Sequence, residues 1–435
     1  MTSARCITFM ILTKEQQDML DGRSGRVRQL AMDLLVRYGE AVGAERMIKV
    51  DNCGIGTLPV LSAEQYKARG IEPGDYEQYY LRGMFGWDQE GLSLDHFGAS
   101  QVTNLCANTV SNIRHLGAGE EAVRFMQIVD DFIGSRGCVN SNTCAPFLNG
   151  VIPAFGEHCA WSESSAITYL NGVLGARTNN EGGASSACAA ITGYTPYFGL
   201  HTDEARWGTH LIHIQKQPKD PFEWGALGYY AASVVNRGVP VFLGVHSIPS
   251  NDDLRYLATS LATSGEVDMF HVVGVTPEAH TLEQAMGKNQ AAGEFTFGEK
   301  EFQAVMERLN FSKQKKVDIV IFGCPHCSIQ QIKEIAEYVS GKQCRTRLTV
   351  LCSPSTKNIA DRSGYTKKIE EAGGFVGEGA CPLLNASMTP EERVIATNSE
   401  KFAHYVTGMP GYSDKEVHLG SMEQCLNAAL CGEWA

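Results

Sequence analysis

Cysteine is the residue type whose placement says most about chemistry in this sequence. Cys324 and Cys381 each follow a short apolar run near the end of the chain, and Cys144 stands in the polar, Pro-bearing segment 140–147. Cysteines in such places can present thiolates, the usual ligands of iron–sulfur clusters. Three ligands would leave one iron free for substrate, as an open zinc site does. Cys144, Cys324 and Cys381 therefore predict an iron–sulfur cluster, with 4Fe-4S, 3Fe-4S and 2Fe-2S forms all open.

A rival interpretation rests on Cys324-Pro-His-Cys327, a CxxC string at a predicted strand-to-helix junction. Such strings are typical of thiol–disulfide oxidoreductases. Against that function, the motif opens the last quarter of the chain, and the following βαβ pattern ends in another cysteine. The oxidoreductase stays as the alternative, and a non-catalytic cluster protein or sensor is a third interpretation.

The remaining cysteines of the fourteen are expected to be reduced. Cys352, at the end of an apolar run, is the second choice as a cluster ligand. A free cysteine is more often a small buried hydrophobic residue, and this is our interpretation of Cys159, Cys188, Cys344 and Cys425.

Composition limits the possible partners. The 435 residues carry a formal net charge of -12, and the chain has no Lys/Arg-rich run, which argues against nucleic acid. The chain lacks a run of eighteen apolar residues, so no membrane span is predicted. The apolar run that ends at Leu12 is too short for a signal peptide, so the protein is predicted to be cytoplasmic.

The elements that must position these cysteines follow from periodicity. Apolar residues at helical spacing predict helices over 13–46 and 119–133, whereas residues 50–100 show weak periodicity. The C-terminal third alternates short apolar runs with helical stretches: strand 317–322, helix 328–338, strand 347–352, helix 358–372 and strand 374–377. This alternation predicts an α/β fold with βαβ units, a parallel sheet and a site at the carboxyl ends of its strands. We divide the chain into an N-terminal extension (1–12), a main region rich in Gly and Ala (13–310) and a C-terminal βαβ lobe (311–435).

Several strings resemble the aconitase X family in its separate large-subunit form. They are FGEHCAWSESS at 155–165, GARTNNEGG at 175–183, ITG at 191–193, ATSG at 262–265, HVVGVTPEA at 271–279, GCPH at 323–326, ACP at 380–382 and TNS at 397–399. In this order they cover the chain from about residue 10 to its end. The family's cluster cysteines fall on Cys144, Cys324 and Cys381.

The resemblance implies an aconitase-like, multi-lobed architecture with the cluster in the cleft between lobes. It also implies a hydro-lyase that removes water from a small hydroxy-carboxylic acid. Known members dehydrate phosphomevalonate or cis-3-hydroxyproline, and neither is assigned here. The family's catalytic base is a serine in a small swivelling domain, which is a separate polypeptide in the large-subunit form, so a heterodimer is expected.

The sequence departs from the family in places. Asp51-Asn-Cys-Gly-Ile-Gly56 replaces a short HVAG-type segment, residues 57–140 match poorly, and Cys144 lies in CAPF rather than CTPY. Acidic Glu266 and Asp268 follow the ATSG string. We expect such departures where substrates are discriminated.

Eliminating water needs a Lewis acid, a base and a group that clamps the substrate carboxylate. The predicted catalytic residues are Glu157, His158, Ser164, Ser165 and His326. Arg177 is predicted to clamp the carboxylate, since guanidinium binds it through two parallel hydrogen bonds. The other predicted substrate-binding residues are Thr178, Asn179, Glu181, Gly182, Gly183, Ser264, His271, Asn398 and Ser399.

Structural alternatives stay open for most of these residues. Arg177 could form a surface salt bridge, the two serines could pack a helix, and His271 could be a satisfied buried histidine. His326 could orient the cluster rather than touch substrate. Asn398 and Ser399 could cap a helix that begins near Glu400.

Overall fold

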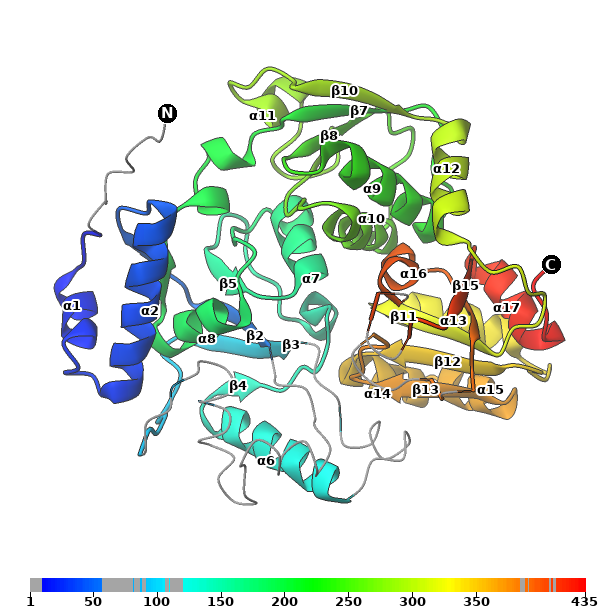
Figure 1. Ribbon diagram of the computed structural model, residues 1–435, viewed down its shortest axis with the longest axis horizontal. Coiled ribbons are helices and arrows are strands. Elements are labelled where there is room, and N and C mark those ends of the chain that lie inside the picture. The colour runs from blue at the N-terminus through cyan, green and yellow to red at the C-terminus, as the bar shows by residue number, and fades with distance from the viewer. Residues whose placement is uncertain are drawn as a thin grey trace.

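Parallel β-sheets form the framework of the protein. The structure is a computed structural model that describes residues 10–56, 81, 87, 91–105, 109, 120–383, 388–389, 391–406, 408–409 and 412–435. Within this part of the chain, two four-stranded sheets and one five-stranded sheet are parallel throughout, and each is the centre of one lobe (Figure 1). This arrangement confirms the predicted α/β class.

Lobe 1 is formed by the first half of the chain. Its sheet has the order β4-β3-β2-β5, with strands β2 (Asn52–Gly56), β3 (Gln101–Leu105), β4 (Cys138–Val139) and β5 (Cys159–Trp161). Its described helices are α1 (Lys14–Leu20), α2 (Arg26–Val42), α6 (Glu120–Ser135), α7 (Ser164–Tyr169) and α8 (Gly183–Thr192). An antiparallel pair, β1 (Met47–Lys49) with β6 (Tyr194–Pro196), lies beside α2.

Lobe 2 carries the sheet β10-β7-β8-β9, from strands β7 (His210–Ile214), β8 (Pro240–Leu243), β9 (His271–Val272) and β10 (Gly293–Phe297). Its helices are α9 (Pro221–Val235), α10 (Asn251–Ser264), α11 (Leu282–Met286) and α12 (Glu299–Leu309). Helix α10 packs closely against α9 and also contacts α7 of lobe 1, so it lies where the lobes meet (Figure 1).

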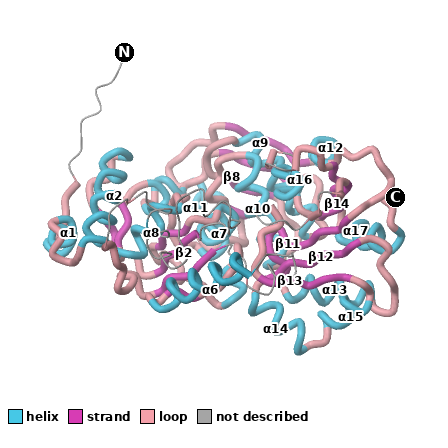
Figure 2. The backbone as a smooth tube through the Cα atoms, turned by 60° about the horizontal axis from the view of Figure 1, so that its bottom comes forward, coloured by secondary structure: helices cyan, strands magenta, loops and turns pink. Residues whose placement is uncertain are grey.

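Lobe 3 carries the sheet β13-β12-β11-β14-β15. Its strands are β11 (Ile319–Cys327), β12 (Arg347–Cys352), β13 (Gly374–Glu378), β14 (Val394–Thr397) and β15 (Glu416–Leu419). Its helices are α13 (Ile329–Val339), α14 (Pro354–Arg362), α15 (Tyr365–Glu371), α16 (Glu400–Val406) and α17 (Met422–Cys431). Helices α13, α14 and α15 pack together along one side of the sheet (Figure 2), whereas α16 packs against α9 and α10 of lobe 2.

The three sheets share one connectivity. In each lobe the first three strands extend the sheet in one direction, and the fourth strand pairs with the free side of the first. The direction of winding therefore reverses between β2 and β5, between β7 and β10, and between β11 and β14. In open parallel sheets, ligands bind beyond the carboxyl ends of the strands at such reversals. The fold thus provides one potential site per lobe.

The predicted elements can be compared with the observed ones. Helix 119–133 is confirmed as α6, and the alternation in the C-terminal third is confirmed by β11, α13, β12 and β13. A single helix over 13–46 is wrong, because Gly22 and Gly25 have positive φ angles and separate α1 from α2. Helix 358–372 is likewise divided at Gly364, also at positive φ. Much of the weakly periodic region 50–100 and most of the 1–12 extension lie outside the described residues.

Among the described helices, none is both long enough and apolar enough to cross a bilayer.

Close helix packing in lobe 2 depends on glycine. A Cβ atom at Gly228 of α9 would lie 2.5 Å from the carbonyl oxygen of Leu257 in α10. We expect Gly228→Ala to lower the free energy of unfolding by about 1–3 kcal/mol, because overpacking moves the backbone. The gain in helix propensity, about 0.5–1 kcal/mol, is too small to offset this. The urea midpoint measures the effect, and Ser233→Ala on the exposed side of α9 is the control. An unchanged midpoint in Gly228→Ala would contradict the packing argument.

Candidate active site

The three predicted cluster cysteines come from three separate segments that meet between lobes 1 and 3, and these segments are called the cysteine loops below. Cys144 precedes a short 3₁₀ helix (Pro146–Asn149), Cys324 lies in the second half of β11, and Cys381 follows β13. Cys324 is buried, whereas Cys144 and Cys381 are partly exposed. Burial raises the pKa of the Cys324 thiol, and the neighbouring Cys381 and Cys144 raise it further. All three thiols therefore lie within one electrostatic neighbourhood.

His326 binds the three loops together. Its backbone N–H donates to Sγ of Cys144 at 3.4 Å. Its ring Nε2 lies 2.6 Å from the carbonyl oxygen of Ala380, and its Nδ1 lies 2.8 Å from the hydroxyl of Thr143. The carbonyl can only accept, so Nε2 carries the proton and Nδ1 accepts from Thr143. Burial lowers the pKa of His326 to about 4, so the ring is neutral and both of its nitrogens are used. This geometry favours the positioning role over direct contact with substrate.

The CxxC string does not have the placement that its sequence predicts. We expected Cys324 just beyond the strand, yet β11 continues to Cys327, with a register break after Phe322. Gly323 allows the break, because its φ is +119° and a Cβ there would lie 2.5 Å from the Leu351 carbonyl oxygen. Cys327 is therefore a strand residue paired with Cys352, and α13 begins only after the cap Ser328.

The environment of Cys327 also argues against thiol exchange. Its burial raises the pKa of the thiol to about 12, whereas a redox-active cysteine needs a lowered pKa and access to solvent. Cys352 is buried too, and its pKa is raised well above the usual value. The oxidoreductase alternative is therefore not supported.

A charged group next to Cys324 was not predicted from the sequence. The ammonium of Lys401, in α16, donates to Oγ of Ser165 at 2.7 Å and to Oγ of Ser164 at 3.0 Å. It also lies 3.3 Å from Glu163, and both of these charged side chains are largely buried. The same ammonium lowers the pKa of Cys324 against the effect of burial. Lobe 3 thus places a cation between Cys324 and the start of α7.

The start of α7 is shaped by Glu163. Its carboxylate accepts from the backbone N–H of Ala166 at 2.6 Å and so caps the helix. Ser164 and Ser165 are the first two residues of α7, which directs their hydroxyls to Lys401. One signal in the sequence could have indicated Lys401: it lies two residues after Ser399, just past the strand β14 that borders the winding reversal.

Asn398 and Ser399 also lie at this reversal. The Ser399 hydroxyl bonds the Cys324 thiol and accepts from the backbone N–H of Phe402 at 3.0 Å, so it both caps α16 and contacts a predicted ligand. Asn398 donates to the hydroxyl of Tyr256 in α10 at 3.1 Å, and its Oδ1 is buried without a partner among the described residues. The structure therefore brings both residues to the cysteine loops.

Arg177 and His158 lie in a separate polar cluster. The Arg177 guanidinium bonds the Asp203 carboxylate and donates to the carbonyl of His201 at 3.0 Å. Nδ1 of His158 lies 3.0 Å from Nδ1 of His201, and burial lowers the pKa of His201 to about 3. Within the described part of the chain, no hydrogen bond or ion pair joins this cluster to the cysteine loops. The contacts of Arg177 therefore favour a structural salt bridge over the predicted carboxylate clamp.

The segment after Arg177 is bonded within lobe 1. Thr178 bonds the backbone of Trp161, and Asn179 bonds the backbone of Phe198 and Leu200. Glu181 is buried and accepts from two hydroxyls, and burial raises its pKa. Gly182 and Gly183 begin α8 without a side-chain cap. The remaining predicted catalytic residue, Glu157, accepts from the backbone N–H of Ala154 and closes a turn.

The predicted residues of lobe 2 have structural partners. Ser264 donates to the carbonyl of Tyr229 at 2.7 Å, and Nε2 of His271 donates to the carbonyl of Arg206 at 2.8 Å. His271 is buried, which lowers its pKa. The two acidic departures from the family, Glu266 and Asp268, bond Arg237 and Asn180 respectively. These contacts are those of structural residues, although Nδ1 of His271 is buried without a hydrogen-bond partner among the described residues.

The donor set can be tested against a metal group. Within the described ranges, no three His, Cys, Asp or Glu side chains surround one point closely enough to hold a single metal ion. A cluster makes a different demand, because each thiolate binds its own iron and the three sulfurs stay apart. Three thiols from three joined loops, two of them partly exposed, fit that demand. Cys159, Cys188 and Cys425 are buried as predicted, while Cys344 is only partly buried.

The fold and the cysteine site define a three-lobed parallel α/β protein with thiols gathered at a lobe junction. Its sequence matches the family profiles of the aconitase X first domain over residues 9–204, second domain over 208–307 and third domain over 317–431. The chain belongs to the aconitase X family, and it is an enzyme of the hydro-lyase class.

Individual relatives agree with this membership. The chain is 35% identical to the "Phosphomevalonate dehydratase large subunit" of Methanocaldococcus jannaschii, over 96% of this chain and 99% of that one. It is 29% identical to the "Cis-3-hydroxy-L-proline dehydratase" of Hypocrea jecorina, over 97% of this chain and 69% of that one. The crystal structure of Thermococcus kodakaraensis aconitase X (holo-form) superposes with a TM-score of 0.80 at 30% identity, covering 97% of this chain and all of that one.

Thiol reactivity tests the description of Cys327. Because burial raises its pKa to about 12, the thiol stays protonated at neutral pH and gains thiolate only as the pH approaches that value. We expect iodoacetamide at pH 8 to alkylate exposed Cys431 readily and Cys327 far more slowly, as measured by peptide mass spectrometry over time. Equal rates at Cys327 and Cys431 would show that the string is accessible and reactive after all.

Proposed function

We propose that this chain is the large, cluster-bearing subunit of a dehydratase that removes water from a small hydroxy-carboxylic acid. The observation that carries the proposal is the union of three cysteine loops through His326, with Lys401, Ser164 and Ser165 beside Cys324. Membership of the aconitase X family supports the reaction class, and the relatives' names supply the type of substrate.

Cys144, Cys324 and Cys381 would hold an iron–sulfur cluster. Such a cluster, with one iron lacking a protein ligand, supplies a Lewis acid for the departing hydroxyl group. Thiols must lose their protons to bind iron, and the raised pKa of Cys324 describes the thiol without metal. The adjacent ammonium of Lys401 makes the thiolate at Cys324 easier to form.

Lys401 is our choice to bind the substrate carboxylate. It is a largely buried cation at the cysteine site, and a charge-assisted bond is strong in such surroundings. We prefer it to Arg177 because Lys401 lies beside Cys324, whereas Arg177 lies in a separate cluster with Asp203 and His201. The substrate carboxylate would take the place of one of the present partners of Lys401, which are Glu163, Ser164 and Ser165. Lys401 donates to the hydroxyl oxygens of Ser164 and Ser165, so each hydroxyl keeps its own hydrogen free to donate to substrate.

The base that takes a proton from the adjacent carbon is proposed to come from a small subunit. Relatives that match this chain over nearly their whole length are named as large subunits, which supports a separate partner. In line with the resemblance to the family, we propose that the base is a serine of a small swivelling domain. The partner would then close over the cysteine loops and complete the site.

The decisive experiment begins with protein purified without oxygen after co-expression with a small-subunit partner. Iron and acid-labile sulfide per chain are measured first, followed by dehydration of phosphomevalonate and of cis-3-hydroxyproline, with products identified by mass spectrometry. Iron and sulfide in comparable amounts, together with turnover of one hydroxy acid, would support the proposal. Absence of iron after anaerobic reconstitution would refute the cluster.

Substitution of single cysteines tests the ligand set. Cys144→Ala should abolish the iron content and the visible absorption, because the partly exposed Cys144 thiol is one of the three ligands. Cys327→Ala should retain both, since this thiol is buried in β11. Cys431→Ala, at an exposed position, controls for loss of a thiol as such. Iron lost from Cys327→Ala but kept in Cys144→Ala would overturn the assignment.

Substitution of Lys401 separates substrate binding from cluster binding. Lys401→Met should lower kcat/KM, expressed per iron-loaded enzyme, by about 10- to 100-fold, the usual worth of a hydrogen bond to a charged group. Iron content is measured in the same samples, because the lost ammonium also favours the thiolate of Cys324. The matched control is Lys333→Met on α13, where the lysine is partly exposed and forms a weak ion pair with Glu337. Unchanged kcat/KM in Lys401→Met would exclude the ammonium as a carboxylate clamp.

A further inference from the structure

A buried arginine of lobe 2 reaches the cysteine site from behind. Arg255, in α10, has a side chain that is 2% exposed. A buried guanidinium is costly unless its donors are paired. Here Nη2 donates to Asp252 at 2.8 Å and to Oε1 of Gln331 at 2.6 Å, and Nη1 donates to the carbonyl oxygen of His326. The charge of the guanidinium is therefore neutralised by Asp252, and its Nη1 group donates to the backbone carbonyl of His326.

This third bond falls on the residue that joins the cysteine loops. The backbone N–H of His326 donates to Cys144, and its ring links Thr143 to Ala380. By holding the carbonyl group of His326, Arg255 therefore also restrains the backbone N–H and the imidazole ring that bond Cys144, Thr143 and Ala380. Among the described residues no hydrogen bond joins Arg255 to the three cysteines, and its direct bond to the cysteine loops is the one to His326.

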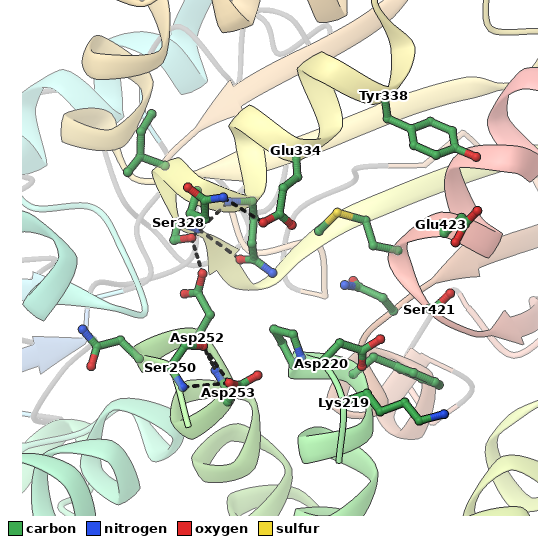
Figure 3. Close-up of a pocket in the computed structure, with 18 of the residues that line it drawn as sticks. Lys219, Asp220, Ser250, Asp252, Asp253, Ser328, Glu334, Tyr338, Ser421 and Glu423 are labelled. Atoms are coloured by element: carbon green, nitrogen blue, oxygen red, sulfur yellow. Dashed lines mark hydrogen bonds between the residues drawn. The ribbon is translucent and has the colours of Figure 1, made fainter. Parts of the chain in front are cut away.

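Asp252, the partner of Arg255, lies at the edge of a cavity that is open to solvent. This cavity of about 840 Å³ lies between lobes 2 and 3, walled by the first turns of α9, α10, α13 and α17. One oxygen of Asp252 accepts from Arg255. The other accepts from the hydroxyl of Ser328 at 2.6 Å, a bond that Figure 3 shows. Ser328 caps α13 directly after Cys327. Asp252 thus holds both Arg255 and the residue that ends the cysteine-bearing strand.

We propose that Arg255, oriented by Asp252, is a positioning residue that keeps the three cysteine loops in the geometry required to bind the cluster. The proposal rests on the proposed function, because it assumes that these cysteines are cluster ligands. Arginine is needed here because its planar fork bonds Asp252, Gln331 and His326 at once, which a lysine ammonium on a flexible stem does not reproduce. Outer partners of metal ligands commonly change metal affinity by about 10- to 100-fold.

The test compares matched pairs of variants in the full chain with its small-subunit partner. Arg255→Lys keeps the positive charge but loses the planar, forked set of N–H donors. Asp252→Asn keeps the size and shape of the side chain but loses its negative charge. The controls are Arg237→Lys and Asp253→Asn. Arg237 forms an exposed ion pair with Glu266, and Asp253 is a neighbouring carboxylate that bonds Ser250 instead. We expect Arg255→Lys and Asp252→Asn to lose iron about 10- to 100-fold faster to a chelator than the controls do, with an altered visible spectrum.

A second measurement does not depend on the cluster. In metal-free protein, the alkylation rate of Cys144 should rise in Arg255→Lys. The rate of Cys344, which is also partly exposed but precedes β12 at the opposite edge of the sheet from His326, should not change. A lower Tm with unchanged spectrum, chelation rate and Cys144 alkylation would mean that Arg255 only stabilises the fold, and would overturn the proposal. If the wild type binds no iron, the proposed function fails. A selective rise at Cys144 would then still support the positioning role, and its absence would refute it.

Discussion

The contacts of His326 are the interaction on which the rest of the site depends. A neutral, fully buried imidazole and its own peptide group bond Thr143 and Cys144 in one loop of lobe 1 and Ala380 in a loop of lobe 3. Each bond has a fixed direction, because the carbonyl of Ala380 can only accept and the thiol of Cys144 receives a backbone N–H. Unpaired polar groups would be expensive at this depth. The loops therefore have one satisfied arrangement, and it places the three thiols together.

Helix α10 extends this order to the whole molecule. It packs on α9 within lobe 2, contacts α7 of lobe 1, and contacts α16 and β11 of lobe 3. The winding reversals of lobes 1 and 3 face the same junction, where the start of α7 meets Lys401 of α16. Three sheets with one connectivity thus contribute differently: lobes 1 and 3 supply the polar groups of the site, and lobe 2 supplies the support behind it.

The sequence was informative where a single segment decides the outcome. Apolar runs alternating with helical periodicity indicated the sheet of lobe 3, and the residue type of Cys144, Cys324 and Cys381, with their places at or near the ends of apolar runs or in a polar loop, predicted a shared site. It was less informative where glycines with positive φ angles change the course of the backbone. Gly22, Gly25 and Gly364 divide predicted helices, and Gly323 allows the register break that keeps the CxxC string within a strand. The common strand order of the lobes is a property of connectivity, so it leaves no repeat in the residues.

Groups that act through partners far apart in the chain were the hardest to predict. Lys401 reaches the site only because α16 lies beside α7, which is more than two hundred residues away in the chain. Arg255 reaches His326 only because α10 lies beside β11. The reverse holds for Arg177, whose motif suggested a clamp until Asp203 was found to occupy its guanidinium.

The lobe junction is polar, and this has an energetic consequence. Replacing a buried ion pair by apolar groups often costs nothing, whereas removing one partner costs about 3–5 kcal/mol, a large share of the roughly 5–15 kcal/mol that stabilises a typical protein. Arg255 with Asp252, and Lys401 with Glu163, therefore add little net stability compared with an apolar contact of the same size. What they add is selectivity among arrangements, because a shift of lobe 3 would separate Lys401 from Glu163 and Arg255 from its acceptors on His326 and Gln331. A site assembled from three loops needs that selectivity more than it needs strength, and this explains why charged side chains occupy a junction that apolar residues could have filled.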